Sequence, residues 1–327
     1  CRVVIRFQKI IGGSIACRFL LAEFVVGMFL LGLVLAIYRQ DVVNQRTMLA
    51  QESEHVVDLQ REILLSELRG IQSDLLYLAD QELLQKFLSD RDSARGDLER
   101  EYINFAQQQN LYDQIRFLDT TGQEQVRINY HAGEAEAVSY DQLQSKASRY
   151  YFRQSLSLMK NEVFVSPFDL NVEHGEIEQP IQPVIRFATP VYEPRGTKQG
   201  LLVLNYLGTP MLNKLLEVAS SFRGETMLLN SAGHYLQSSD PTNQWGWLLG
   251  HPHNFREEFP GAWFEGKDHD ATQVRIDGNL FTFRKLYPGV CLDDDSRESK
   301  NQGDVQDPNG LVLVSRVSPS VASAHSR

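Results

Sequence analysis

The sequence lacks the residues and motifs that identify most chemical functions. Its 327 residues include only three cysteines, Cys1, Cys17 and Cys291, so no disulfide framework braces the bulk of the chain. It contains no nucleophile elbow, zinc-protease helix, phosphate-binding Walker loop or dinucleotide-binding glycine pattern. We therefore expect no catalytic residues and no cofactor in this chain.

Clustered positive charge and metal-ligand spacing are also absent. The 32 basic residues are outnumbered by 42 acidic ones, and the net charge of -10 argues against nucleic acid as a partner. His251 and His253 are two residues apart, as in some zinc sites, but no third ligand is close in sequence. The Asp293-Asp294-Asp295 run lacks the alternating ligands and the distal glutamate of a calcium loop. We expect no metal site.

A long apolar run near the amino terminus is the strongest physical signal that the sequence does contain. Residues 19–38 are apolar except for Glu23 and two glycines, and a helix of this length crosses ~30 Å of hydrocarbon. Residues 1–18 carry only basic charges and mixed charges follow residue 38, which predicts a cytoplasmic amino end. The alternative is a cleaved signal peptide, although the run is long and no clear cleavage site follows it.

A second helical pattern follows the apolar run. In residues 41–88 apolar side chains recur at three- and four-residue steps without a proline, which predicts a long helix with Gly70 as its candidate break. Such a helix suits a mechanical connection between the membrane and a distal domain. The alternative is an amphipathic helix packed on one domain. Its long apolar face also makes a homodimer plausible.

Strand and turn signals dominate the rest of the chain. Residues 114–129 predict a hairpin around the Thr121-Gly122 turn, and the same strand, glycine turn and strand return in residues 225–236. Further strands are predicted at residues 162–167, 181–191, 200–206, 274–276, 280–284 and 310–314, and a helix at 210–219. Residues 301–309 predict an exposed loop. The pattern indicates an α+β fold of two modules, each with an antiparallel sheet.

Four motifs occur in the order seen in one family of receptors. They are Arg116-Phe117-Leu118-Asp119 followed by Gly122, Glu124 and Arg127; Leu143-Gln144 followed by Lys146 and Arg149-Tyr150-Tyr151-Phe152; Ser166-Pro167-Phe168-Asp169-Leu170-Asn171; and Arg186-Phe187-Ala188-Thr189-Pro190-Val191-Tyr192. With them, residues 40–317 resemble the extracytoplasmic double Cache sensors, built of tandem PAS-like modules, of bacterial membrane receptors. The resemblance is strongest to sensors of histidine kinases and diguanylate cyclases.

The resemblance implies a domain organisation. We expect a cytoplasmic segment at residues 1–18, a transmembrane helix at 19–38, a stalk helix at 39–99, a membrane-distal ligand-binding module at 100–215, a membrane-proximal module at 216–317 and a tail at 318–327. The sensor region would lie in the periplasm, anchored in the bacterial inner membrane. A returning membrane helix and an output domain are expected beyond residue 327, so the chain is interpreted as a fragment.

The resemblance also implies a small-molecule site in the distal module. The candidate ligand-binding residues are Lys146, Arg149, Tyr151, Phe152, Phe168, Asp169 and Arg186. Arg149 opens a stretch similar to the Arg-x-Trp-Tyr element of amino-acid sensors, with Tyr in place of Trp. Arg149 would bind a ligand carboxylate, Asp169 an ammonium, and the added positive charge of Lys146 would equally suit an organic acid. The alternative is that Arg149 and Asp169 pair with each other or cap the sheet.

Three functional classes therefore stay open. The first is the sensing region of a membrane receptor, whose output is phosphorylation on histidine or synthesis of cyclic di-GMP. The second is a membrane-anchored binding or scaffolding protein without an output domain. The third is an anchored hydrolase that uses carboxylates such as Glu173, Glu176 or Glu178, to which the sequence assigns no acid or base role.

Overall fold

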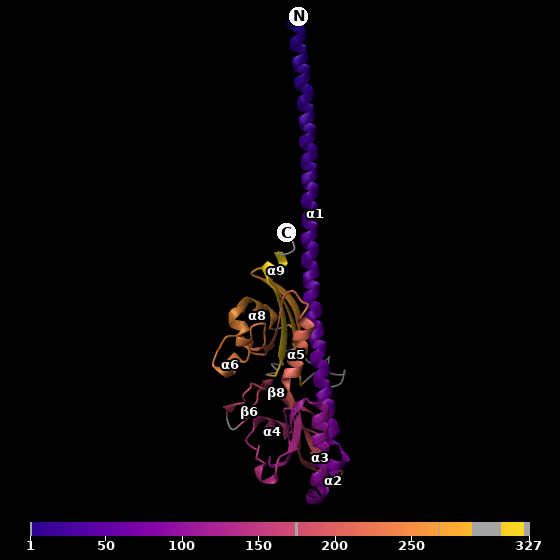
Figure 1. Cartoon of the computed structure of the whole chain (residues 1–327), viewed down its shortest axis with the longest axis vertical. Helices are drawn as coiled ribbons and strands as arrows, with labels where there is room; N and C mark the ends of the chain where they lie inside the picture. The colour runs from indigo at the N-terminus through magenta and orange to yellow at the C-terminus, as the bar shows by residue number, and fades with distance from the viewer. Residues whose placement is uncertain (1, 174–175, 268, 290–308, 324–327) are drawn as a thin grey trace. The chain divides into compact units, whose positions relative to one another are not determined.

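The computed structural model describes residues 2–173, 176–267, 269–289 and 309–323 (Figure 1). The chain divides into two units, one made of Cys1–Glu52 and Pro319–Arg327 and the other of Ser53–Ser318. Helix α1 (Arg2–Ala79) begins in the first unit and ends in the second. The first unit also contains the short helix α9 (Pro319–Ser323).

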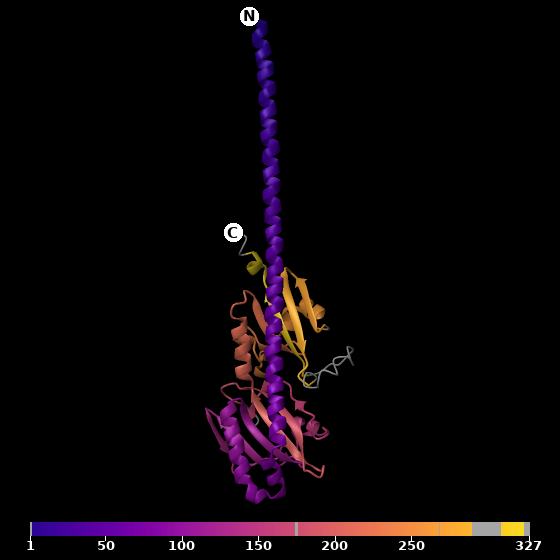
Figure 2. The ribbon, with the colours of Figure 1, turned by 90° about the vertical axis from the view of Figure 1, so that its right-hand side faces the viewer.

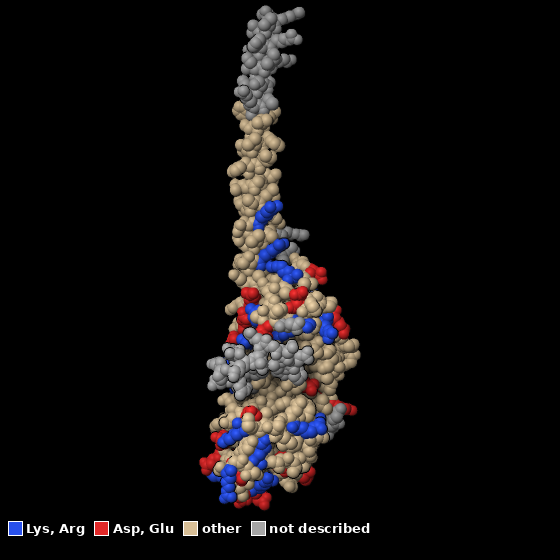
Figure 3. All heavy atoms as spheres, turned by 180° about the vertical axis from the view of Figure 1, so that it is seen from behind, with Lys and Arg blue, Asp and Glu red and all other residues tan. Residues whose placement is uncertain are grey.

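The apolar run lies in the part of α1 that belongs to the first unit. Every side chain in residues 19–38 is exposed, and Figure 3 shows a stretch of uncharged surface on this helix on the face drawn, above the first basic side chains. Within the described residues, α1 is the one helix long and apolar enough to cross a membrane. Exposed apolar surface of this extent is unfavourable in water, and contact with lipid removes that cost.

The carboxyl-terminal part of α1 buries one apolar stripe inside the second unit. Val57, Leu64, Leu68 and Leu75 are fully buried, whereas the opposite face exposes polar side chains. The helix runs through Gly70 without interruption, so the break considered there is wrong; the buried neighbours of this exposed glycine hold the helix in place. The helix ends at Ala79, and the chain turns into α2 (Glu82–Ser89) and α3 (Arg91–Gln109). The single helix predicted over residues 41–88 and the stalk helix expected at 39–99 are therefore wrong beyond Ala79.

The first sheet of the second unit is antiparallel and has seven strands. Its path is β3-β2-β1-β9-β8-β4, and β5 also pairs with β8. The strands are β1 (Tyr112–Asp119), β2 (Glu124–His131), β3 (Glu134–Ala137), β4 (Phe164–Val165), β5 (Asp169–Leu170), β8 (Pro183–Tyr192) and β9 (Lys198–Leu207). A small ribbon of β6 (Val172–Glu173) and β7 (Glu176–Ile177), the turn η1 (Tyr140–Gln142) and helix α4 (Tyr150–Ser155) lie between them in sequence. We call this part of the second unit the distal module.

The second sheet has five antiparallel strands in the order β11-β10-β14-β13-β12. They are β10 (Glu225–Asn230), β11 (Tyr235–Gln237), β12 (Ala271–Ile276), β13 (Asn279–Leu286) and β14 (Leu311–Val317). Helix α5 (Gly208–Ala219) precedes them, and η2 (Pro241–Asn243), α6 (Gly246–Leu249), α7 (Phe255–Glu258) and α8 (Pro260–Gly266) are inserted between β11 and β12. Phe255, Phe281 and Phe283 are at the centre of its core. We call this part the proximal module.

The two modules repeat one topology. In each sheet, the strand that comes last in sequence lies between the first strand and the next-to-last strand. In the distal sheet β9 pairs with β1 and β8, and in the proximal sheet β14 pairs with β10 and β13. Figure 2 shows the strands of both sheets beside α1 within the second unit. The predicted α+β fold with an antiparallel sheet in each of two modules is confirmed.

The repeat extends to the turn between the first two strands of each sheet. Gly122 donates its N–H to Asp119 O at 2.9 Å, and Gly233 donates to Asn230 O at 2.9 Å. Both glycines have a positive φ, 86° and 88°, which residues with a Cβ rarely adopt. At Gly122 a Cβ would also lie 2.7 Å from the Cα of Ala147, so the close approach of the following loop requires glycine.

The remaining differences from the sequence predictions are local. The strand expected at residues 162–167 is only Phe164–Val165, because the chain bends away from β8 and returns as β5. Asn309 is half-buried, not exposed as the predicted loop 301–309 implied. The rest of that loop and the Asp293-Asp294-Asp295 run lie outside the described residues.

Candidate ligand-binding site

One face of the distal sheet is apolar at one end and polar at the other. Because side chains alternate along a strand, Gln114, Arg116 and Leu118 of β1 lie on the same face. On β9, Leu201 lies opposite Leu118 and Asn205 lies opposite Gln114. The polar side chains at one end of this face therefore adjoin the packed apolar side chains at the other end.

Helix α4 covers the apolar end of this face. Its Tyr151 and Phe152 are each 3% exposed and pack into one cluster with side chains from three strands. Those side chains are Leu118, Ala188, Leu201 and Val203. Two of the predicted ligand-binding residues, Tyr151 and Phe152, thus hold α4 against the sheet.

Arg116 lies where the apolar end meets the polar end. Its side chain is 4% exposed. Nη1 donates to the Tyr151 hydroxyl at 3.0 Å, and Nη2 donates to Asn205 Oδ1 at 2.5 Å. Its Nε is buried and has no hydrogen-bond partner. Nε is therefore the donor of this guanidinium that remains without a partner.

Three basic side chains surround the fully buried carboxylate of Glu124. Oε1 is 3.7 Å from Lys146 Nζ and 3.9 Å from Arg116 Nη1, and Oε2 is 4.0 Å from Arg127 Nη1. Oε2 also accepts the backbone N–H of Gln144 at 2.9 Å. Positive charge is therefore concentrated at a place of low exposure, where electrostatic interactions are weakly screened.

Arg186 connects the Tyr151 ring to Asn171, which has two acidic hydrogen-bond partners. Its guanidinium is 5.8 Å from the centre of the Tyr151 ring, and Nη2 donates to Asn171 Oδ1 at 3.4 Å. Asn171 in turn donates to Glu178 Oε2 at 2.8 Å and to Asp113 Oδ2 at 3.5 Å. We call Arg116, Glu124, Arg127, Lys146, Tyr151, Arg186 and Asn205 the distal polar cluster.

The structure brings together some of the residues predicted from sequence and separates others. Lys146, Tyr151 and Arg186 belong to the distal polar cluster, and Phe152 packs beside it. Arg149, in contrast, is exposed at the start of α4. Its ligand-binding role stays a prediction.

Phe168 and Asp169 make contacts outside the distal polar cluster. The Phe168 ring contacts Trp245 of the proximal module at 5.3 Å between ring centres. Asp169 is half-buried, and its Oδ1 accepts the N–H of Leu170 at 2.8 Å. Among the described residues, no ion pair joins Asp169 to Arg149, so the alternative in which these two pair is not observed.

Sequence reasoning assigned no role to three central residues of the cluster, Arg116, Glu124 and Asn205. A signal was present, because Gln114 and Arg116 alternate with apolar residues in the predicted strand, which the structure shows to be buried. Polar side chains two apart on a buried strand require partners on that face. The identity of those partners depends on β9, which is far away in sequence.

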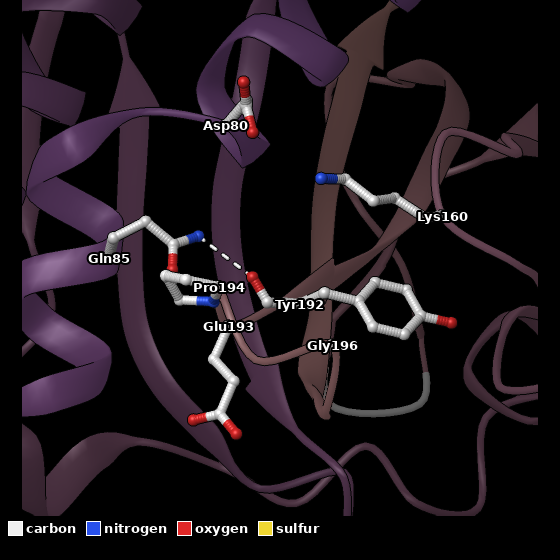
Figure 4. Close-up of a pocket in the computed structure, with 7 residues that line it drawn as sticks. All are labelled: Asp80, Gln85, Lys160, Tyr192, Glu193, Pro194 and Gly196. Carbon is white, nitrogen blue, oxygen red and sulfur yellow. Dashed lines mark hydrogen bonds between the residues drawn. The ribbon is translucent and has the colours of Figure 1, made fainter.

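A surface hollow of about 500 Å³ lies elsewhere on the distal module (Figure 4). In Figure 4, Asp80 and Lys160 extend toward the hollow, and Gln85 donates to Tyr192 O at 3.0 Å. None of its lining residues belongs to the distal polar cluster. Because Asp80 and Lys160 are exposed, water screens their charges, and the buried cluster is the stronger candidate for specific recognition.

Metal binding finds no support in the portion of the chain that the structure describes, where no three His, Cys, Asp or Glu side chains converge. His253 instead lies 2.9 Å from Glu258 Oε2, which also accepts the Tyr235 hydroxyl. Burial lowers the pKa of nearby His234 below its ordinary value, and the charge of Glu257 opposes this shift only in part.

Comparison with known proteins identifies the family. The profile of the bacterial histidine kinase sensor domain matches residues 49–289, about three quarters of the chain. The chain belongs to this family. A search of curated proteins finds no match.

Two solved structures show the same fold for this sensor domain, and a third is more distantly similar. One, described as the extracellular domain of the histidine kinase vpHK1S-Z8, is 24% identical over 84% of this chain and 95% of that chain, with a TM-score of 0.66. A sensory box/GGDEF family domain from Vibrio parahaemolyticus is 23% identical over 84% and 99% of the two chains, with a TM-score of 0.63. The ligand-binding domain of the Campylobacter jejuni chemoreceptor Tlp3, in complex with 4-methylisoleucine, is 12% identical over 88% and 94%, with a TM-score of 0.48.

These findings confirm the interpretation of this chain as the sensing region of a signal-transduction receptor of the histidine kinase type. The matched region begins at residue 49, close to Ser53, where the second structural unit begins. The scaffold and hydrolase alternatives gain no support. The sensor domain thus comprises most of the second unit.

Proposed function

We propose that this sensor domain detects a small molecule with a carboxylate group, an amino acid or an organic acid, on the distal polar cluster. The observation that carries this proposal is Arg116, a buried guanidinium with an unpartnered Nε beside an aromatic wall. A buried guanidinium without its full set of hydrogen bonds is unfavourable, and a carboxylate is the group that best completes it.

The surroundings of Arg116 suit such a ligand. Lys146 and Arg186 add positive charge on either side of Tyr151, and the Tyr151 ring provides an apolar contact for the ligand's carbon atoms. The carboxylates of Asp113 and Glu178, both bonded to Asn171, are positioned to accept an ammonium. This division favours a zwitterion, such as an amino acid, over a simple monocarboxylate.

The receptor context is also part of the proposal. We infer that residues 19–38 anchor the chain in the bacterial inner membrane, with modules at about residues 100–215 and 216–317 in the periplasm. A histidine kinase output is favoured by the family, and a cyclase by the GGDEF neighbour. A homodimer is proposed on the resemblance alone, because the apolar face of α1 that suggested it is buried within the second unit.

The test is thermal unfolding of the complete chain in detergent micelles with a panel of L-amino acids, mono- and dicarboxylates, and aliphatic amines. A ligand at 100 times its Kd stabilises the folded state by about 2.7 kcal/mol and raises Tm by on the order of 5 °C in a domain of this size. Arg186→Gln removes a charged contact without emptying the core, so we expect it to weaken binding by about tenfold or more.

Three further variants test which residues contribute to ligand binding. Arg153→Gln, on the exposed side of α4, is the matched control and should bind like the parent. Arg149→Ala tests the carboxylate-binding role that the sequence predicts for Arg149, separately from the role proposed for Arg116 and Arg186. Arg116→Lys keeps the charge but loses the planar donors, and we expect weaker binding. Stabilisation by amines alone, or by no compound, would contradict the proposal.

A further inference from the structure

Residues 164–171 lie between the distal polar cluster and the proximal module. On the side of the cluster, Ser166 and Arg186 exchange two hydrogen bonds: Ser166 N–H donates to Arg186 O, and Arg186 N–H donates to Ser166 Oγ, each at 2.8 Å. At the end of the segment, Asn171 accepts from the Arg186 side chain at 3.4 Å. A shift of Arg186 therefore displaces this segment.

The same segment contacts the proximal module at two points. The Phe168 ring meets Trp245 edge-on, and these side chains are 5% and 4% exposed. Asn309 Nδ2 donates to Val165 O at 2.9 Å. Gly208 confines Phe168 from behind, since a Cβ there would lie 2.3 Å from the ring. The Phe168 ring thus has little room to move without moving Trp245.

Trp245 is itself held in an unfavourable backbone conformation. Its φ of 60° is in the left-handed region, which is unusual for a large side chain. Its N–H donates to Tyr235 O at 2.8 Å, which joins it to strand β11. Such a conformation persists only where the surrounding contacts impose it, so loss of the Phe168 contact favours its relaxation.

Asn309 leads directly into the central strand of the proximal sheet. Strand β14 begins two residues later, pairs with β10 on one side and β13 on the other, and ends at Val317. Along this strand, Ser315 Oγ lies 2.6 Å from Ser53 Oγ of α1. One strand is thus linked to the distal module at its start and to α1 near its end.

We propose that residues 164–171, Trp245 and Asn309 couple the distal polar cluster to strand β14. The inference rests on the proposed function, because the coupling has a biological role only if a ligand binds the cluster. Trp245 and Asn309 are positioning residues that never touch the ligand. Each shifts the equilibrium between two arrangements of residues 164–171, and linkage requires that the effect is reciprocal.

Hydrogen exchange measured by mass spectrometry on the complete chain in micelles tests this coupling without any ligand. Asn309→Ala removes the bond to Val165, so we expect residues 164–171 to exchange roughly fivefold faster, the factor that loss of one ordinary hydrogen bond gives. Phe168→Leu should likewise speed exchange in residues 311–314. Asn213→Ala, an exposed amide on α5, is the matched control and should change neither segment.

Two internal references separate coupling from a merely structural effect. Residues 114–118 of β1 and 271–276 of β12 should keep their parental exchange rates in Asn309→Ala and Phe168→Leu. The inference would be overturned if exchange rates changed only in the module that carries the substitution. It would also be overturned if exchange in the reference strands accelerated by the same factor. If Phe168→Leu unfolds the chain, Asn309→Ala still decides, because its side chain is only half-buried. Failure of the ligand screen leaves this outcome unaffected, so the two proposals fail separately.

Discussion

At the scale of single residues, the turn between β1 and β2 shows how one side chain organises several backbone groups. Asp119 Oδ1 accepts N–H groups of Thr121 at 2.8 Å and Gln123 at 3.1 Å, and Oδ2 accepts the Gln125 amide at 2.8 Å. Desolvation is the largest single effect and raises the pKa of Asp119, but the hydrogen bonds together lower the pKa below its ordinary value. The folded state therefore favours the ionised carboxylate.

This shift predicts a pH dependence of stability. An acid whose pKa is lower in the folded state adds stability above its unfolded pKa of 3.8, and that stability is lost as the pH falls through the folded pKa. Asp119→Ala should lower the free energy of unfolding by about 1–3 kcal/mol at pH 7. The difference from the parent should shrink between pH 4 and pH 2.

Urea unfolding at several pH values measures this difference. Asp141→Asn, at an exposed position in the same module, is the control and should leave stability within about 0.5 kcal/mol of the parent. A difference between Asp119→Ala and the parent that stays constant down to pH 2 would show that the charge of Asp119 has no role in the turn.

At the scale of elements, α1 contacts the proximal sheet through hydroxyl groups as well as apolar side chains. Ser53 Oγ lies 2.8 Å from Thr282 Oγ1 and 2.6 Å from Ser315 Oγ, and all three residues are fully buried. Asp58 on the next turn pairs with Arg284 at 2.6 Å. Because buried hydroxyls must be satisfied, these contacts fix the helix in one register along β13 and β14.

Removal of the Ser53 hydroxyl should therefore weaken this contact. Ser53→Ala leaves Ser315 without its hydroxyl partner, and we expect a loss of about 1–2 kcal/mol in the free energy of unfolding. Chemical denaturation of the complete chain in micelles measures the loss. Ser73→Ala, an exposed position on the same helix, is the matched control. Equal stability of the two variants would refute a structural role for the hydroxyl contacts.

At the scale of the whole molecule, one chain combines an exposed apolar helix with a unit that has its own buried core. The second unit, Ser53–Ser318, contains both sheets, whereas the side chains of residues 19–38 are all exposed. Because the second unit has its own buried core, we expect it to fold without the apolar helix. The apolar helix, in contrast, needs lipid or detergent.

We therefore expect the two parts to behave differently when separated. Residues 39–318 should remain dispersed in buffer without detergent, whereas the complete chain should float with phospholipid vesicles in a density gradient. The complete chain with Leu30→Lys and Leu33→Lys is the control, because each charge near the bilayer centre costs about 2.5–3.5 kcal/mol, and it should float less. Flotation of residues 39–318 to the same extent as the complete chain would contradict a membrane role for residues 19–38.

The sequence by itself determined the features that depend on neighbouring residues. The apolar run, the amphipathic helix and the two glycine turns depend on patterns of residues that are close in sequence. Hydrophobic periodicity specifies which face of each element is buried. The repeat of the turn at Gly122 and Gly233 was sufficient to predict two similar modules. The break at Gly70 was predicted wrongly, because burial of the residues around a glycine outweighs its low helix propensity.

The tertiary structure decided which of several arginines is buried and what it contacts. Arg116 and Arg149 are chemically identical, yet only Arg116 is buried, because Tyr151 and Asn205 bond it from 35 and 89 residues away. The contact between Phe168 and Trp245 likewise joins two modules. Strand pairing and module contact depend on side chains distant in sequence, and no local pattern specifies which of them meet.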